Sequence, residues 1–308
     1  MLHRPEPDLG ELGRAVDGPR PGSKTRAQVW KVADGGWSKR DDLLATEEPM
    51  EIRLLARDER KTLAVTMRTP GNDFELAVGF LFAEGVIPGR HGIARIAYCR
   101  DPDLTKEERY NVVHVELAAE KLPDLKLLER SFFTTSACGV CGRASLEALE
   151  HRNLTPLPPG PEVAQATLSS LPAELRARQG IFQVTGGLHA AALFDTDGKL
   201  LALREDVGRH NAMDKLIGWA VLEGLLPWRD TIVLVSGRTS YEILQKCIVA
   251  GASIVCAISA PSSLALDLAR AFNVTLVGFL RDDRFNLYNG RERVRATEEF
   301  TSLPGSGR

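Results

Sequence analysis

Two cysteines separated by two residues, Cys138 and Cys141, are the side chains of this sequence best suited to covalent chemistry. They lie in residues 130–145, RSFFTTSACGVCGRAS, and a helical stretch is predicted directly after them, over residues 144–150. Thiols at a helix N-terminus lie at the positive end of the helix dipole, and Arg143 adds positive charge, so the thiolate should form readily. The flanking glycines leave the segment accessible to partners. This pattern favours a sulfur nucleophile.

Four kinds of site use a cysteine pair with this spacing. A structural zinc site needs two more ligands at short spacing, and the other cysteines and histidines form no second C-x-x-C or H-x-x-x-H pattern. A zinc deaminase needs H-x-E before P-C-x-x-C, but His189 follows the pair and Ala137 stands in place of the proline. A thioredoxin-type dithiol stays open as an alternative, although the pair lies mid-chain beside the proline-rich residues 156–159. A persulfide carrier needs one reactive thiol and a nearby acceptor site. The sequence predicts no metal site.

Polar residues gather at three loops that follow strands in the second half of the chain. The loops are residues 236–240 (SGRTS), 259–263 (SAPSS) and 281–284 (RDDR). Ligands of α/β sheets bind at the carboxyl ends of the strands, where loops lead into helix N-termini. Backbone N–H groups and arginine guanidinium groups there are suited to phosphate oxygens. The loops therefore predict a crevice for a phosphate-bearing ligand.

Other polar groups leave two interpretations open. His189 lies between small and apolar residues, so it is either a core histidine or a catalyst. Residues 204–211, REDVGRHN, are either a solvated helix start or part of a site. Cys247 and Cys256 fall on an apolar helix face and in a buried strand, which favours inert core positions, whereas Cys99 stands at a strand end and is ambiguous.

The second half of the chain alternates strands and helices. Short β-branched runs at residues 231–235, 253–258 and 274–279 are separated by amphipathic stretches at 241–250 and 264–272. This order predicts parallel strands that are buried on both faces. A further helix is predicted over residues 210–222, ending at Gly224. The fold class is therefore α/β, a sheet covered by helices.

The first half predicts a smaller α+β unit. Period-two alternation indicates a hairpin from residues 52–55 and 62–67, and a strand pair at 93–99 and 111–117 with a charged loop, 101–108, between them. A helix that ends at Gly85 should pack on the hairpin, with Asn72 as its N-cap and Glu75 completing a capping box. We expect a flexible tail over residues 1–25, an N-terminal subdomain over 26–125 and a C-terminal α/β domain over 126–300.

Composition excludes several classes of partner. With 39 basic and 41 acidic residues the net charge is −2, so no global charge points to nucleic acid or to an anionic membrane. The N-terminal residues lack the apolar run of a signal peptide, and no stretch has the length of a bilayer span. We expect a cytoplasmic protein.

Six segments together resemble one family, the formate dehydrogenase accessory sulfurtransferases (FdhD). They are TPGNDFELAVGFLFAEG (69–85), TTSACGVCG (134–142), TGGLHAAA (185–192), EDVGRHNAMDK (205–215), SGRTS (236–240) and SAPSSLA (259–265). The likeness spans about residues 45–290. It implies a cytidine-deaminase-like fold, a homodimer, and formate dehydrogenase and a cysteine desulfurase as partners.

The resemblance also implies an activity. The family takes persulfide sulfur from the desulfurase and transfers it to the molybdenum cofactor, Mo-bis(molybdopterin guanine dinucleotide), before insertion into the enzyme. Cys138 would carry the persulfide as a sulfurtransferase intermediate, and Cys141 would assist or resolve it. The family's cofactor contact lies just beyond the last strand, and with the crevice loops it gives the expected cofactor-binding residues Phe279, Leu280, Arg281, Asp282, Asp283, Arg284, Ser236, Gly237, Arg238 and Ser259. A non-covalent cofactor chaperone and a C-x-x-C dithiol oxidoreductase are the alternatives.

Overall fold

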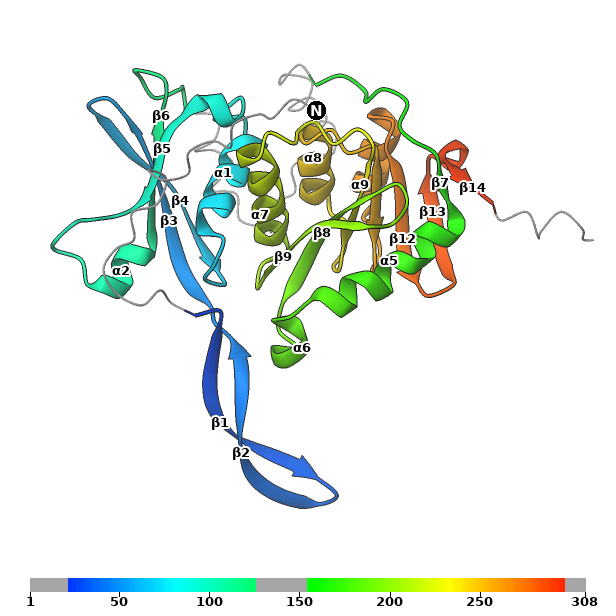
Figure 1. Ribbon diagram of the computed structural model, residues 1–308, viewed down its shortest axis with the longest axis horizontal. Coiled ribbons are helices and arrows are strands. Elements are labelled where there is room, and N and C mark those ends of the chain that lie inside the picture. The colour runs from blue at the N-terminus through cyan, green and yellow to red at the C-terminus, as the bar shows by residue number, and fades with distance from the viewer. Residues whose placement is uncertain (1–21, 126–153, 297–308) are drawn as a thin grey trace, which may run out of the picture.

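The computed structural model describes residues 22–125 and 154–296, and its two main sheets stand side by side (Figure 1). The larger sheet has six strands in the order β13-β12-β11-β10-β8-β9. Its central strands β10, β11 and β12 are parallel, and β8, β9 and β13 are antiparallel to their neighbours. The three parallel strands confirm the runs predicted from sequence. The strand bounds are β8 His189–Asp195, β9 Leu200–Asp206, β10 Thr231–Val235, β11 Ile254–Ala257, β12 Thr275–Arg281 and β13 Arg284–Asn289.

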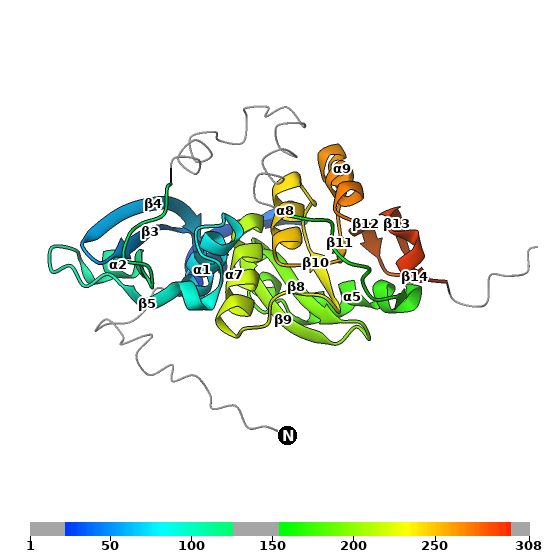
Figure 2. The ribbon, with the colours of Figure 1, turned by 90° about the horizontal axis from the view of Figure 1, so that it is seen from above.

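Helices cover both faces of this sheet. Helices α7 (Arg209–Leu222), α8 (Tyr241–Val249) and α9 (Ser263–Ala271) lie on one face, and α5 (Gln165–Arg178) lies on the other (Figure 2). Because side chains alternate along a strand, Val233 and Val235 of β10 join the apolar cluster with α7, α8 and α9, whereas Ile232 and Leu234 join the cluster with α5. The predicted α/β sheet buried on both faces is confirmed.

The smaller sheet has four strands in the order β4-β3-β6-β5. The predicted hairpin is confirmed as β3 (Glu48–Ala56) with β4 (Glu59–Arg68), and the predicted strand pair as β5 (Ile93–Tyr98) with β6 (Val112–Leu117). A parallel pairing of β3 with β6 joins the two into one sheet. The charged loop ends in a short helix, α2 (Lys106–Tyr110), which starts at a capping box made by Thr105 and Glu108.

Helix α1 (Asp73–Ala83) follows the hairpin, as predicted, but its N-terminus is built differently. Asn72 occupies the N-cap position with a left-handed φ of 56°, and its side chain accepts no capping hydrogen bond. Asp73 closes the turn instead by accepting from the backbone N–H of Gly71 at 3.2 Å. Glu75 accepts from Arg204 at 2.7 Å. The predicted capping box at this helix is therefore wrong, because a long-range ion pair takes up the glutamate.

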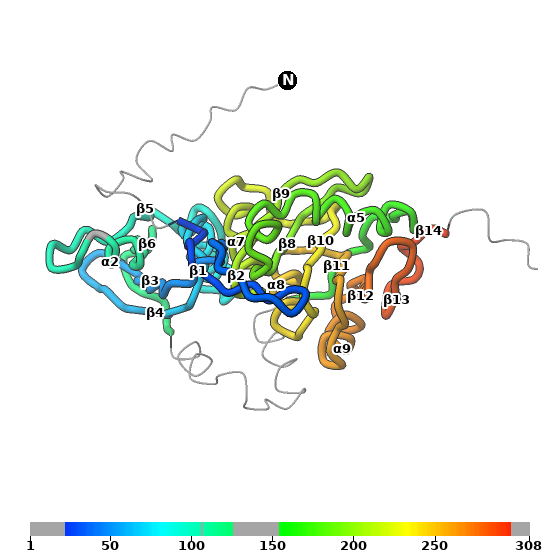
Figure 3. Tube along the Cα trace, turned by 90° about the horizontal axis from the view of Figure 1, so that it is seen from below, coloured from blue at the N-terminus to red at the C-terminus, as the bar shows by residue number. Residues whose placement is uncertain are grey.

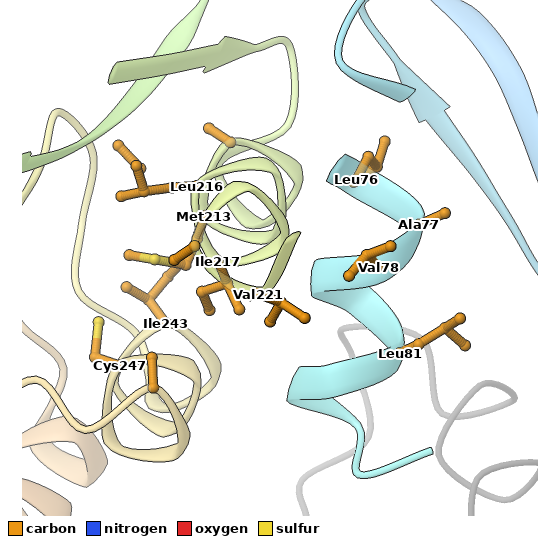
Figure 4. Close-up of a cluster of buried hydrophobic side chains, with 14 of the residues drawn as sticks. Leu76, Ala77, Val78, Leu81, Met213, Leu216, Ile217, Val221, Ile243 and Cys247 are labelled. Carbon is orange, nitrogen blue, oxygen red and sulfur yellow. The ribbon is translucent and has the colours of Figure 1, made fainter. Parts of the chain in front are cut away.

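Helix α1 lies between the small sheet and α7, rather than on the hairpin alone. Gly79 and Gly218 permit a very close crossing, because a Cβ on Gly79 would overlap the carbonyl oxygen of Asp214 and one on Gly218 would overlap that of Glu75. Val78 and Val221 lie between the two helices in Figure 4. A single apolar cluster thus runs from the small sheet through α1 and α7 to α8 and α9.

A two-stranded arm projects from the body of the molecule. It consists of β1 (Lys24–Ala33) and β2 (Gly36–Ala45), paired antiparallel, and it points away from both main sheets (Figure 1) and stands in front of them in the view from below (Figure 3). Trp30 and Trp37 are 59% and 69% exposed, with their rings 6.4 Å apart. The sequence analysis did not predict this arm, and its first strand begins at Lys24.

The remaining elements are short. Strand β7 (Val163–Ala164) pairs parallel with β14 (Val294–Arg295), and α6 (Phe182–Thr185) precedes β8. Single 3-10 turns span Arg90–Gly92 and Arg291–Arg293. None of the helices within residues 22–125 and 154–296 is both long and apolar enough to cross a bilayer.

Candidate functional site

The carboxyl ends of β10, β11 and β12 meet at one edge of the large sheet, and the loops that leave them touch one another. The backbone N–H of Ser262 donates to the carbonyl of Thr239 at 3.0 Å, and that of Phe279 donates to the carbonyl of Ser259 at 3.1 Å. The predicted loops 236–240 and 259–263 are therefore neighbours, and the end of β12 adjoins the second of them. This edge is the candidate site.

Several hydroxyls at this edge have structural partners. Ser240 caps α8 by accepting from Ile243 N–H at 3.4 Å, and Ser262 caps α9 by accepting from Ala265 N–H at 3.2 Å. The hydroxyl of Ser236 accepts from the backbone N–H of Ala190 at 2.9 Å. Its own hydrogen remains free to donate to a ligand. The two cap serines thus hold helix starts, and Ser236 combines a structural bond with a free donor.

The residues that were expected beyond the last strand lie instead at the end of β12, in the two-residue turn of Asp282 and Asp283 and at the start of β13, because β12 extends to Arg281 and a further strand pairs with it. Arg281 and Arg284 are cross-strand partners in this turn, both are exposed, and neither guanidinium bonds to another described residue. Phe279 has a left-handed φ of 52° and is 41% exposed. Leu280 points to the opposite face, where it is fully buried in the cluster under α5. Arg284 also lines a cavity of about 390 Å³ with Arg291 and Phe285.

A histidine and an arginine complete the edge on the side of β8. His189 is the first residue of β8 and adjoins Gly237, because a Cβ on that glycine would lie 3.4 Å from His189 Nδ1 and 3.7 Å from Arg209 Cδ. Partial burial, followed by the charges of Arg209 and His210, lowers the pKa of His189 below its usual value. The Nε of Arg209 is buried without a partner among the described residues. His189 therefore belongs to the edge and not to the apolar core.

His210, which follows Arg209 at the start of α7, contacts the carboxylate of Glu242. Its Nε2 lies 2.8 Å from a carboxylate oxygen of Glu242 and 3.4 Å from Ser240 Oγ. The hydrogen bond from His210 lowers the pKa of Glu242 despite its partial burial. This pair links the starts of α7 and α8 beside the site.

The rest of the EDVGRHNAMDK segment forms a buried polar joint. Asp206 is fully buried and lies 2.7 Å from the ammonium group of Lys215. Its carboxylate also accepts from Thr69 N–H at 3.1 Å, from Gly208 N–H at 2.8 Å and from Asn211 at 3.0 Å. Lys215 donates to the carbonyl of Thr69 at 2.8 Å. These residues are buried, so they are not the solvated helix start of the first interpretation, and their contacts are those of a structural joint.

The cysteines separate into two groups. Cys138 and Cys141, the predicted catalytic pair, lie outside the described residues. Cys247 and Cys256 are fully buried, as predicted, and burial raises the pKa of both thiols, that of Cys247 to about 12. Neither can serve as a thiolate near neutral pH. In the described part of the chain, no group of three or more His, Cys, Asp or Glu residues could hold a metal ion.

Comparison with known proteins places this architecture in one family. The profile of the FdhD/NarQ family matches residues 45–295. A protein of Streptomyces coelicolor named sulfur carrier protein FdhD is 49% identical over 272 residues, which cover 87% of this chain and 95% of the relative. A protein of Sulfurisphaera tokodaii with the same name is 46% identical over 269 residues, which cover 87% and 98% of the two chains.

A solved structure has the same overall fold. The crystal structure of a protein from Desulfotalea psychrophila, assigned as a formate dehydrogenase accessory protein, superposes with a TM-score of 0.66 at 25% sequence identity and covers 89% of this chain and all of its own. The matched profile extends from the small sheet to the end of the large sheet. This chain therefore belongs to the FdhD/NarQ family.

Proposed function

We propose that this protein is a sulfur carrier for formate dehydrogenase maturation. It takes persulfide sulfur from a cysteine desulfurase and passes it to the molybdenum cofactor, Mo-bis(molybdopterin guanine dinucleotide). The observation that carries the proposal is family membership over residues 45–295 together with relatives named sulfur carrier proteins at 46–49% identity. The solved relative assigned as a formate dehydrogenase accessory protein supports the choice of client enzyme.

The first half of the transfer uses Cys138. Its thiolate attacks the terminal sulfur of the donor's cysteine persulfide, so an S–S bond forms to Cys138 while the donor's S–S bond breaks and the donor leaves as a thiolate. No external oxidant is needed, because one disulfide-type bond replaces another. In the second half an electron pair of the acceptor attacks the terminal sulfur, so a bond from the acceptor to sulfur forms while the persulfide S–S bond breaks and Cys138 is released as a thiolate. Cys141 assists or resolves the persulfide.

The acceptor binds at the carboxyl edge of the large sheet. Arg281 and Arg284 carry exposed guanidinium groups with no partner among the described residues, which suits them to bidentate binding of phosphate oxygens. Phe279 offers a partly exposed ring on which a guanine base can stack. The loop groups Ser236, Gly237, Arg238 and Ser259 supply hydroxyl and backbone donors at the same edge.

The test loads the protein with a cysteine desulfurase and free cysteine, and then uses intact mass and peptide mapping. We expect a sulfur-mass adduct on Cys138 that is lost to a sulfur acceptor, abolished by Cys138→Ala and retained in part by Cys141→Ala. Arg281→Ala/Arg284→Ala should load normally but bind guanosine diphosphate, the probe for the acceptor's nucleotide, at least about tenfold more weakly. Absence of an adduct while Cys138→Ala still matures formate dehydrogenase would establish a non-covalent chaperone. A Cys138 to Cys141 disulfide as the sole product would indicate a dithiol oxidoreductase.

Three further properties belong to the same proposal. We place the carrier in the cytoplasm, where desulfurase and apo-enzyme meet, and we expect a homodimer with a cytidine-deaminase-like core. Sedimentation velocity of the full chain measures the oligomeric state directly.

A further inference from the structure

One face of the small sheet is open. Helix α1 covers the face that carries Met50, Ile52 and Leu54, and the opposite face carries no described helix apart from the short α2 near its end (Figure 1). Because side chains alternate across a sheet, the open face presents a second set of residues. These are Glu51, Arg53 and Leu55 of β3, Arg60 and Thr62 of β4, Arg95 and Ala97 of β5, and Val112, His114 and Glu116 of β6.

This open face is hollowed into a cavity of about 320 Å³. The strand register brings its lining together, since Leu55 pairs with Arg60 and with Glu116, Glu116 pairs with Arg95, and His114 pairs with Ala97. Leu55 and Ala97 give it an apolar part. The complete lining is Leu55, Arg60, Arg95, Ala97, Tyr98, Cys99, Arg100, Asp101, His114 and Glu116.

The charges of the lining favour an anion. Three arginines face two carboxylates, those of Asp101 and Glu116. The neighbouring Arg53 is neutralised by Glu51, to which it donates two hydrogen bonds of 2.6 Å. Arg60 and Arg95 have no hydrogen bond or ion pair with any described residue. Two guanidinium groups are thus unengaged in a concave site, the arrangement that binds carboxylate or phosphate.

A buried nitrogen of the lining also lacks a partner. His114 Nε2 is inaccessible to solvent and has no hydrogen bond within the described chain. Buried polar atoms without a partner are rare, so each points to a missing group. Burial, then the charges of Arg60 and Arg53, lower the pKa of His114, while Glu51 and Asp101 act in the opposite sense. The neutral ring can donate to or accept from a ligand.

We propose that this pocket binds a small organic anion. A carboxylate or phosphate group is held by Arg60 and Arg95 beside the imidazole ring of His114, and the carbon skeleton of the ligand packs on Leu55 and Ala97. The cavity volume suits a molecule of metabolite size. This site lies on the small sheet, so it is separate from the edge of the large sheet proposed for the molybdenum cofactor.

The test titrates citrate and glycerol 3-phosphate into the full-length protein by calorimetry, which separates carboxylate from phosphate as the preferred group. We expect at least one probe to bind at one site per chain and Arg60→Gln/Arg95→Gln to weaken it at least about tenfold. The matched control is Arg176→Gln/Arg178→Gln, which removes the same charge from exposed positions in the last turn of α5 and should keep the affinity. Binding of neither probe, or equal loss in both double variants, would overturn the proposal.

A second measurement reads the pocket directly. Proton NMR follows the imidazole resonances, assigned for His114 by the His114→Gln variant. The bound anion should raise the pKa of His114 and shift its resonance, while those of His189 and His210 stay unchanged. Arg60→Gln/Arg95→Gln should also load sulfur on Cys138 like the wild type, so failure of this site and failure of the sulfur-carrier proposal are distinguishable. A His114 resonance that does not shift when the anion is added would contradict the proposal that this pocket binds it.

Discussion

Two buried aspartate–lysine pairs fix α7, and they differ in how well their charges are satisfied. Lys215 lies 2.7 Å from Asp206, and Lys246 lies 2.7 Å from Asp214. Asp206 accepts three further hydrogen bonds, from Thr69, Gly208 and Asn211. Asp214 accepts only from Lys246 among the described residues. The two pairs therefore have the same distance between nitrogen and oxygen, but their carboxylates accept different numbers of hydrogen bonds.

The difference shows in the acid–base behaviour of the second pair. Burial raises the pKa of Asp214 to about 6, and the attraction of Lys246 offsets only part of this effect. The carboxylates of Asp214 and Glu84 keep Lys246 charged and raise its pKa despite burial. A buried ion pair stabilises a fold only when its remaining hydrogen-bonding capacity is also satisfied. The first pair is thus a structural joint, and the second is a pair that titrates.

The largest expected effect separates the two aspartates. Asp206→Ala leaves a buried ammonium group and three N–H donors unpaired, so we expect a loss of about 3–5 kcal/mol of stability at neutral pH. Asp214→Ala leaves one ammonium group that still has Glu84 at 3.9 Å, so the loss should be about 1–3 kcal/mol. Urea unfolding measures both. Asp206→Asn, which keeps the shape, serves if the alanine variant does not fold, and equal losses would refute the distinction.

A second change tests the helix crossing that lies between the two pairs. Gly218→Ala places a methyl group on the carbonyl of Glu75 and forces α1 away from α7, which strains the contacts of Lys215 with Thr69 and of Lys246 with Glu84 at the two ends of α1. We expect a loss of about 1–3 kcal/mol from this overpacking. Gly180→Ala is the matched control, because its new Cβ would meet nothing within 4 Å. Thermal unfolding compares the two, and a neutral Gly218→Ala would contradict the close crossing.

The third effect is a pH dependence of the second pair. Asp214 titrates near 3.8 when unfolded and near 6 when folded, so its contribution is fully present below about pH 3.8 and is lost as the pH rises to about 6. Relative to Asp214→Asn/Lys246→Met, the wild type should lose on the order of 1–3 kcal/mol over this window. Urea unfolding at constant ionic strength from pH 4 to 7 measures it. If the free energies of unfolding of the two proteins changed with pH by the same amount, this titration of Asp214 would be excluded.

The main sheets were predictable because their signals are local. The β-branched runs of β10 to β12 and the alternation in β3 and β4 each fit one secondary structure, and the apolar faces of α7 and α8 fit their burial. The arm was missed because Trp30, Val32 and Trp37 are exposed, so their alternation does not indicate a buried face. Asn72 takes the N-cap position, but the predicted capping box does not form, because Glu75 is engaged by Arg204, a residue far away in the sequence.

The site was predictable at the level of loops but not of partners. Strand order indicated that residues 236–240 and 259–263 would meet, which the hydrogen bond between Ser262 and Thr239 confirms. Spacing could not show that His189 adjoins Gly237, because this contact depends on the antiparallel pairing of β8 with β10. Residues 205–215 could be interpreted as part of a functional site because buried polar joints and catalytic sites use the same residue types.

The glycine crossing of α1 with α7 also determines how the molecule melts. The two sheets share one continuous apolar cluster through that crossing, so neither can expose its inner face while the other stays intact. Heat should therefore unfold both sheets as one cooperative unit, and a calorimetric scan should show them in a single transition rather than two. The N-terminal sheet should therefore not fold as an independent domain when it is separated from the large sheet.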